Sequence, residues 1–131
     1  MNKKTIAFIC VHNACRSQIA EALGRLLLPE HFVCCSAGTQ TRPQIEPGAV
    51  RLMQQRYGID MTQEQYSKTI TEIPTPDILI SMGCGVQCPY VGRPFDEDWG
   101  LPDPTGQPDA VYFAVMDEIE QRLRQLAQRY Q

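Results

Sequence analysis

A short apolar run followed directly by a helical pattern constrains the fold of this chain most strongly. Residues 5–10 read Thr-Ile-Ala-Phe-Ile-Cys, a nearly continuous apolar run with β-branched and aromatic members, as expected of a strand buried on both faces. From Ser17 the apolar residues recur at helical spacing until Pro29 ends the pattern. The order strand, loop, helix therefore predicts a βα unit at the start of the chain.

The rest of the chain continues this alternation. Further strands are predicted at Phe32–Ser36 and Asp77–Met82, with a weaker one near Pro94-Phe95, and further helices at Pro47–Tyr57 and Asp109–Arg129. Alternating strands and helices at short spacings favour parallel strands joined by right-handed crossovers. We therefore predict one α/β domain over residues 1–131, an open four-stranded parallel sheet with helices on both faces in a Rossmann-like three-layer arrangement.

Composition narrows the class of protein and its compartment. The chain has 131 residues, six cysteines and a net charge of −3, so it is large enough to need no disulfide or metal staple. The apolar run Ile6–Val11 is too short for the core of an export signal, and no stretch approaches the ~20 apolar residues that span a bilayer. The mildly acidic net charge disfavours binding to nucleic acid. These features predict a cytoplasmic protein with reduced thiols and no membrane or nucleic-acid partner.

The loop after the first strand carries the most unusual residues. Cys10 is followed six positions later by Arg16 and then by Ser17, between a predicted strand and a predicted helix. Such a loop can point successive backbone N–H groups inward and form an anion cradle, which the helix dipole reinforces. Arg16 can add a bidentate contact to a tetrahedral oxyanion. The positive field and a hydrogen bond from Ser17 would favour the thiolate of Cys10, a nucleophile beneath the bound oxyanion.

Simpler interpretations of these residues remain open at this point. Cys10 could be a small buried residue at a strand end, and Arg16 an ordinary charge on a helix surface. His12 is interpreted as a hydrogen-bonding loop residue, because a thiolate stabilised by loop dipoles needs no catalytic base. For Cys15, packing and a role in the loop are equally compatible with the sequence.

The loop resembles that of a known family. Residues 8–22 look like the phosphate-binding loop of the low-molecular-weight protein tyrosine phosphatase superfamily, and Asn13, residues 16–18 and 20–21, and Ser36-Ala37-Gly38 are most similar to its thioredoxin-coupled arsenate reductases. The resemblance implies the phosphatase-like fold, with Cys10 as nucleophile. It also implies that the oxyanion is bound by the loop residues Val11, His12, Asn13, Ala14, Cys15 and Arg16.

The same resemblance assigns a general acid. Asp103-Pro104 matches the Asp-Pro that the superfamily places opposite the nucleophile, where a carboxylic acid protonates the leaving oxygen, a step worth about 10²- to 10⁴-fold. Without the Cys10 loop, Asp103 would read as an ordinary turn aspartate. The chain continues with Thr105-Gly106-Gln107 and lacks the aromatic residues with which phosphatases stack on phosphotyrosine. This favours a small inorganic oxyanion as substrate.

The loop after the third predicted strand holds a second pair of cysteines. Cys84 and Cys88 lie four residues apart and are flanked by glycines, and in a helical turn such positions are roughly 6 Å apart, within reach of a disulfide. The resemblance implies a relay in which Cys84 attacks the Cys10 adduct and Cys88 then attacks Cys84. The resulting disulfide would be reduced by thioredoxin. The close spacing also resembles reductases in which a small thiol of the mycothiol type attacks the adduct directly.

No bound cofactor or metal is predicted. A zinc site built from Cys84, Cys88, Cys34 and Cys35 is disfavoured, because adjacent cysteines in a strand point to opposite faces. Some relatives bind potassium near the loop through Asn13, Glu21, Ser36 and an acidic residue after a later serine. Here Lys68 follows Ser67, and its ammonium would take the place of the ion.

These observations predict an enzyme that reduces arsenate to arsenite in arsenic detoxification, with an external thiol as reductant. The alternative is a low-molecular-weight protein tyrosine phosphatase that hydrolyses phosphomonoesters through a phosphocysteine, for which Cys84 and Cys88 would be incidental. A third reading is a phosphate-sensing module that keeps the loop but lacks turnover.

Overall fold

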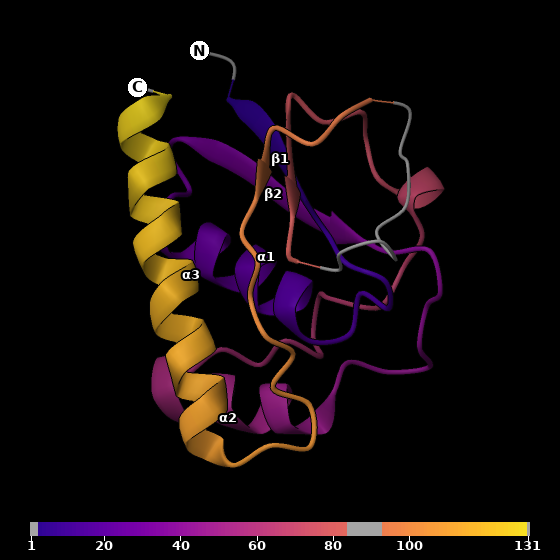
Figure 1. Ribbon diagram of the computed structural model, residues 1–131, viewed down its shortest axis with the longest axis vertical. Coiled ribbons are helices and arrows are strands. Elements are labelled where there is room, and N and C mark those ends of the chain that lie inside the picture. Colours follow the sequence, from indigo (N-terminus) through magenta and orange to yellow (C-terminus); the bar gives the residue numbers. More distant parts are fainter. Residues whose placement is uncertain (1–2, 84–92, 131) are drawn as a thin grey trace.

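A four-stranded, wholly parallel sheet forms the centre of the computed structural model, which describes residues 3–83 and 93–130. The strand order is β2-β1-β3-β4. The elements are β1 (Lys4–Ile9), α1 (Arg16–Leu27), β2 (Phe32–Ala37), α2 (Pro47–Tyr57), the 3₁₀ helix η1 (Ile70–Glu72), β3 (Ile78–Ser81), β4 (Glu97–Asp98) and α3 (Asp109–Arg129). The predicted α/β fold with four parallel strands is confirmed (Figure 1).

The fourth strand differs in position from its prediction. It lies at Glu97–Asp98, where two residues pair with Ile80 and Ser81 of β3, and not at Pro94-Phe95. Phe95 instead packs against the outer face of the sheet. The apolar side chain on which the prediction depended therefore covers the sheet and does not extend it.

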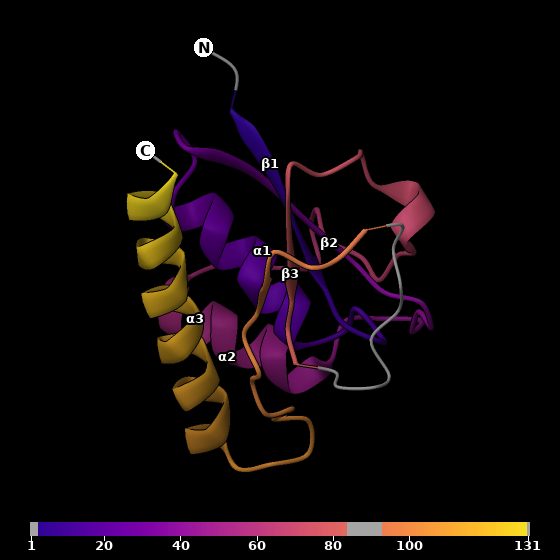
Figure 2. The ribbon, with the colours of Figure 1, turned by 45° about the horizontal axis from the view of Figure 1, so that its top comes forward.

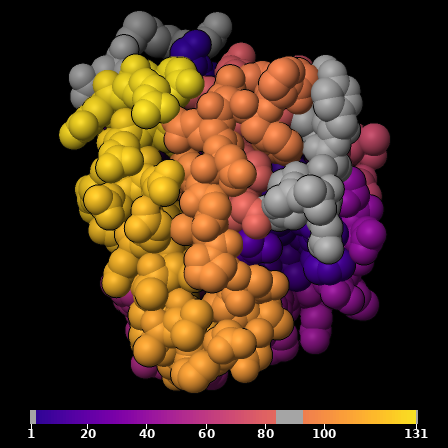
Figure 3. All heavy atoms as spheres, viewed as in Figure 1, coloured from indigo at the N-terminus to yellow at the C-terminus, as the bar shows by residue number. Residues whose placement is uncertain are grey.

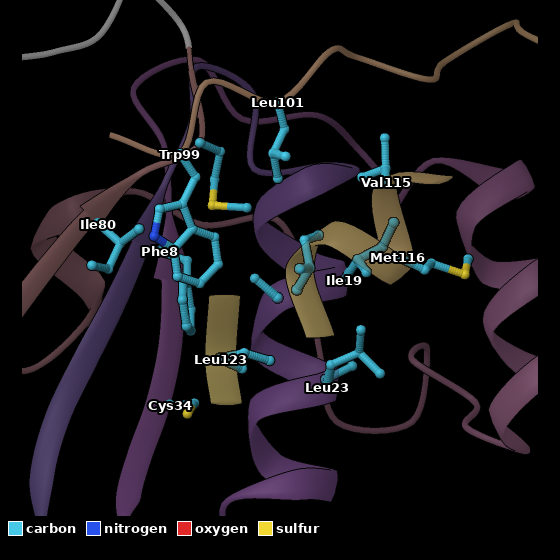
Figure 4. Close-up of a cluster of buried hydrophobic side chains, with 14 of the residues drawn as sticks. Phe8, Ile19, Leu23, Cys34, Ile80, Trp99, Leu101, Val115, Met116 and Leu123 are labelled. Carbon is cyan, nitrogen blue, oxygen red and sulfur yellow. The ribbon is translucent and has the colours of Figure 1, made fainter. Parts of the chain in front are cut away.

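Within the described residues, the α-helices α1, α2 and α3 pack on one face of the sheet, whereas helices were predicted on both faces; the other face is covered by the short 3₁₀ helix η1 and by Phe95. Phe8 of β1, Ile80 of β3 and Trp99 meet residues of α1 and α3 in the main core (Figure 4), and the ring centroids of Phe8 and Trp99 are 5.5 Å apart. Two views show the helices together on one side of the sheet (Figures 1 and 2). A smaller cluster on the other face joins β1, β2 and β3 to η1 and Phe95.

The segment between β4 and α3 returns the chain across the helical side. Residues 99–108 run beside α3 on the surface (Figure 3), and their backbone is tied to the end of β3, where Leu101 N donates to Met82 O at 3.1 Å. This brings Asp103 to the edge where β1 and β3 end. Within the described residues, no helix has the length and apolar character to cross a membrane.

Candidate active site

The loop between β1 and α1 is held tightly against the end of β2. Gly38 follows β2, and a Cβ atom at this position would lie 2.5 Å from Val11 O and 2.7 Å from Cys10 O. Only glycine permits this approach. Asn13 adopts a positive φ of 49°, a conformation that asparagine tolerates better than most residues. The loop is therefore wound into a compact turn around Cys10.

The sulfur of Cys10 is surrounded by hydrogen-bond donors. Asn13 N donates to Cys10 Sγ at 3.2 Å, and Ser17 Oγ lies 2.9 Å from the same sulfur. Asn13 Nδ2 donates to Ser17 Oγ at 2.8 Å. The hydroxyl oxygen accepts this bond, which leaves its own hydrogen available to the sulfur. Two donors thus stabilise negative charge on Cys10.

The orientation of the Asn13 amide is itself fixed from outside the loop. Its Oδ1 accepts from Gln18 Nε2 at 2.9 Å and from the backbone N of Lys68 at 3.0 Å, so Nδ2 must face Ser17. Gln65 Nε2 in turn donates to Gln18 Oε1 at 2.8 Å. The segment 65–68 therefore positions the donor that acts on Cys10 through Asn13 and Ser17.

The loop also presents a set of unpaired amides. Within the described chain, none of five backbone N–H groups near Cys10 donates a hydrogen bond, namely those of Val11, His12, Ala14, Cys15 and Arg16. Arg16 places NH1 2.7 Å from Leu101 O and 3.2 Å from Met82 O, which anchors the guanidinium across the ends of β3 and the following loop. Such an arrangement of donors is suited to a tetrahedral oxyanion.

A cavity of about 350 Å³ lies above this loop and contains the predicted nucleophile and acid. Cys10, Arg16 and Asp103 all line it. Asp103 Oδ1 accepts from Thr105 N at 3.1 Å and from Thr105 Oγ1 at 2.7 Å, which fixes the carboxyl group in a tight turn. A thiol, a guanidinium and a carboxyl group thus share one cavity at the carboxyl edge of the sheet.

The comparison with known families is decisive once this geometry is established. The model of the low molecular weight phosphotyrosine protein phosphatase family matches residues 5–131. The chain belongs to this family. Its predicted relationship to the arsenate reductases within the superfamily is also confirmed, because arsenate reductases are 32–34% identical to it over nearly its whole length.

Three relatives illustrate the similarity. A solved arsenate reductase in the phosphate-binding state superposes with a TM-score of 0.84 at 32% identity, over 98% of this chain and 99% of that one. The thioredoxin-dependent arsenate reductase of Corynebacterium glutamicum gives 0.75 at 32% identity, over 98% of this chain and 64% of that one. The glutaredoxin arsenate reductase of Synechocystis is 34% identical over 94% of this chain and 95% of its own length.

Three further cysteines of this family member are buried. Burial raises the pKa of the Cys15 thiol, and the nearby carboxylates of Glu46 and Asp103 raise it further. Burial also raises the pKa of Cys34 to about 12 and that of Cys35 to about 11. Cys34 faces the main core and Cys35 the smaller one, so adjacent strand positions point to opposite faces as predicted. These thiols stay protonated at neutral pH.

Two further predictions concern the second cysteine pair and the position that a cation occupies in some relatives. Cys84 and Cys88 lie outside the described residues. Lys68 Nζ lies 3.3 Å from Glu21 Oε1 and 3.2 Å from Tyr66 O, and Ser36 Oγ donates to the same Glu21 oxygen at 2.6 Å. Across the described ranges, no group of three or more histidine, cysteine, aspartate or glutamate side chains is arranged to hold a metal ion.

Some residues at the site gave no clear signal in the sequence. Arg42 and Glu46 line the cavity, although neither belongs to a motif that the sequence singled out. Gln65 reaches the site over a separation of 47 residues from Gln18. Only the tertiary fold brings these positions to the loop. In the sequence, the Arg42-Pro43 pair indicates only a loop.

Proposed function

We propose that this protein reduces arsenate to arsenite, with Cys10 as the nucleophile. The observation that carries the proposal is the Cys10 sulfur, which accepts from Asn13 N and lies 2.9 Å from Ser17 Oγ, in a cavity lined by loop residues with unpaired amides and by Arg16. The arsenate reductase names of its relatives support the choice of substrate. The missing aromatic residues after Asp103-Pro104 favour an inorganic oxyanion over phosphotyrosine.

The first step forms a sulfur–arsenic bond. The Cys10 thiolate attacks arsenic, one arsenate oxygen leaves as water, and Asp103 donates a proton to that leaving oxygen. Arg16 and the loop amides stabilise the negative charge that develops on the remaining oxygens. The arsenic is still pentavalent at this point.

The second step transfers two electrons to arsenic. The thiolate of Cys84 attacks Cys10 Sγ, the sulfur–arsenic bond breaks with its electron pair on arsenic, and arsenite leaves. A Cys10–Cys84 disulfide remains. Cys88 then attacks Cys84, which frees Cys10 and leaves a Cys84–Cys88 disulfide for thioredoxin to reduce. In the variant with a small thiol, that thiol replaces Cys84 in the attack.

Steady-state turnover tests the nucleophile and the acid. Arsenate-dependent oxidation of NADPH, coupled through thioredoxin and its reductase or through a mycothiol-based system, is expected to disappear in Cys10→Ser. Asp103→Asn is expected to lower kcat by about 10²-fold. Cys35→Ser is the matched control, because its sulfur lies on the outer face of the sheet. Unchanged turnover in Asp103→Asn would remove Asp103 from the mechanism.

The relay and the reductant need a different variant. Cys84→Ser is expected to lose turnover with thioredoxin while it keeps hydrolysis of a small aryl phosphate, and intact-mass analysis of the wild-type protein after arsenate exposure is expected to show a Cys84–Cys88 disulfide. Full turnover of Cys84→Ser with thioredoxin would rule out the relay. If wild-type protein hydrolyses aryl phosphates but does not reduce arsenate with either reductant, the phosphatase alternative replaces this proposal.

A further inference from the structure

Two arginines differ from all the others in this chain. Of its nine arginines, seven form ion pairs with carboxylates: Arg25, Arg51, Arg56, Arg93, Arg122, Arg124 and Arg129. In the described part of the chain, Arg16 and Arg42 are without a carboxylate partner. Both line the cavity above Cys10. Arg16 was predicted to bind the oxyanion, but Arg42 has no role so far.

The backbone at Arg42 is bound to the oxyanion loop. Arg42 N donates to Ser67 Oγ at 3.0 Å, and that hydroxyl donates to His12 O at 2.8 Å. Nearby, Thr39 N and Gln40 N both donate to Val11 O at 2.9 Å. Residues 39–42 therefore keep a fixed position relative to the loop that surrounds Cys10.

The side chain is held by His12. Arg42 NH2 lies 3.0 Å from His12 Nε2, and His12 Nδ1 lies 3.0 Å from Gln40 O. A guanidinium can only donate and a carbonyl oxygen can only accept, so Nε2 carries no proton and Nδ1 carries one. In this tautomer His12 accepts from Arg42 through Nε2. It orients Arg42 without neutralising the positive charge.

The other charged groups that line the cavity indicate a role for the positive charge of Arg42. Two carboxylates also line the cavity, those of Glu46 and Asp103. Glu46 accepts from Gly48 N, Ala49 N and Tyr112 Oη, and a carboxylate at this position repels an entering anion. A second cation beside Arg16 and the loop amides would offset these two carboxylates and strengthen the binding of a divalent oxyanion.

We propose that Arg42 is a second cationic binding residue for the tetrahedral oxyanion, which it contacts on the side opposite the loop amides, and that His12 is its positioning residue. The inference rests on the proposed function for the identity of the substrate, but not for the binding of an oxyanion as such. It assigns to His12 a structural task in substrate binding in place of acid–base catalysis.

Binding of inorganic phosphate to the reduced full-length protein tests this directly. We expect isothermal titration calorimetry at low ionic strength to give a Kd about tenfold higher for Arg42→Gln than for wild type, since a hydrogen bond to a charged group is lost. Arg42→Lys should fall in between, because lysine keeps the charge but loses the planar fork. Arg124→Gln makes the same charge change on exposed α3 and should bind like wild type. Equal Kd values for Arg42→Gln and wild type would overturn the inference.

A second set of variants tests His12. His12→Ala should weaken phosphate binding in the same direction as Arg42→Gln, and adding Arg42→Gln to it should have little further effect. His12→Gln should restore binding, because its amide oxygen can accept from Arg42. Independent, additive losses in the double variant would contradict the positioning role. Thermal unfolding of each variant establishes that the fold is unchanged.

Turnover separates this inference from the proposed function. Arg42→Gln should raise KM for arsenate about tenfold with little change in kcat, because a mainly electrostatic contact to the anion acts on binding. If wild-type protein binds phosphate through Arg42 but reduces no arsenate, the proposed reaction fails and the binding role stands. If arsenate is reduced and Arg42→Gln changes neither KM nor the phosphate Kd, the reverse holds.

Discussion

Asn13 illustrates what a single residue contributes here and why the sequence could predict only part of it. The contact of Ser17 with Cys10 was predicted, because the two are separated by one loop and the turn into α1. The amide orientation of Asn13 was not, since it depends on Lys68, 55 residues away. Local spacing predicts local contacts. The groups that fix their direction come from distant segments of the chain.

Glu21 and Lys68 provide a test at this scale. The Glu21 carboxylate is 1% exposed, and its Oε1 contacts Lys68 and Ser36, while Oε2 pairs with Arg25 at 3.0 Å. Lys68→Met removes the buried partner of Glu21 and leaves only the half-exposed Arg25 to compensate its charge, so the free energy of unfolding should fall by about 3 kcal/mol. Urea denaturation measures this.

Two companion variants make the result specific. Lys4→Met changes an exposed lysine on β1 and should alter stability by less than about 0.5 kcal/mol. Glu21→Gln in the Lys68→Met background removes the poorly compensated buried charge and should recover part of the loss. A loss below about 1 kcal/mol in Lys68→Met would mean that the pair behaves like a surface ion pair.

At the scale of elements, prediction succeeded where an apolar periodicity and residues typical of helix ends mark the same segment. The helices at Pro47–Tyr57 and Asp109–Arg129 begin and end as predicted, because an apolar stripe and end signals mark both. β4 was misplaced because two polar residues, Glu97 and Asp98, form it. Their pairing with β3 is decided by the neighbouring strand, and no periodic pattern of so short a strand could reveal it.

The contact between α1 and β2 depends on one glycine. A Cβ at Gly24 would lie 2.6 Å from Cys34 Sγ. Alanine favours a helix over glycine by about 1 kcal/mol, but the collision should outweigh this, and Gly24→Ala should destabilise the protein by about 1–2 kcal/mol net. Chemical denaturation measures the change.

The double variant isolates the collision. Cys34→Ala removes the sulfur atom, so Gly24→Ala should cost less in that background than in wild type, with a favourable coupling energy of at least about 1 kcal/mol. Cys35→Ala is the matched control, because Cys35 lies on the other face of the sheet. If the two changes are additive, α1 shifts on β2 without strain.

The whole molecule follows the general rule that parallel sheets place their ligand sites at the carboxyl ends of the strands. This rule pointed to the loop with Cys10 and Arg16, the family resemblance placed Asp103 opposite it, and all three residues line the cavity. The rule could not supply Arg42, because that residue belongs to a loop with no strand or helix pattern. The extent of the domain over residues 1–131 and the chemistry of Cys84 and Cys88 stay predictions.

Stability at alkaline pH depends on the buried thiols of the whole core. Burial raises the pKa of Cys34 to about 12 and of Cys35 to about 11, from the 9.0 of an ordinary thiol. At a pH between 9.0 and the raised pKa, the thiol has lost its proton in the unfolded chain but keeps it in the folded chain. The unfolded state therefore binds fewer protons than the folded state. The free energy of unfolding should therefore fall as pH rises above about 9, by about 1.4 kcal/mol per pH unit for each fully titrating thiol.

Urea denaturation at pH 8 and pH 10.5 measures this fall, and a variant carrying both Cys34→Ala and Cys35→Ala isolates the contribution of the two thiols. That variant is less stable than wild type at pH 8, because it loses buried sulfur atoms, but its stability should decline less between the two pH values. Tyr112, whose pKa burial raises to about 12, contributes a residual slope of the same sign to both proteins. An equal decline in the two proteins would show that Cys34 and Cys35 ionise in the folded core as readily as in the unfolded chain.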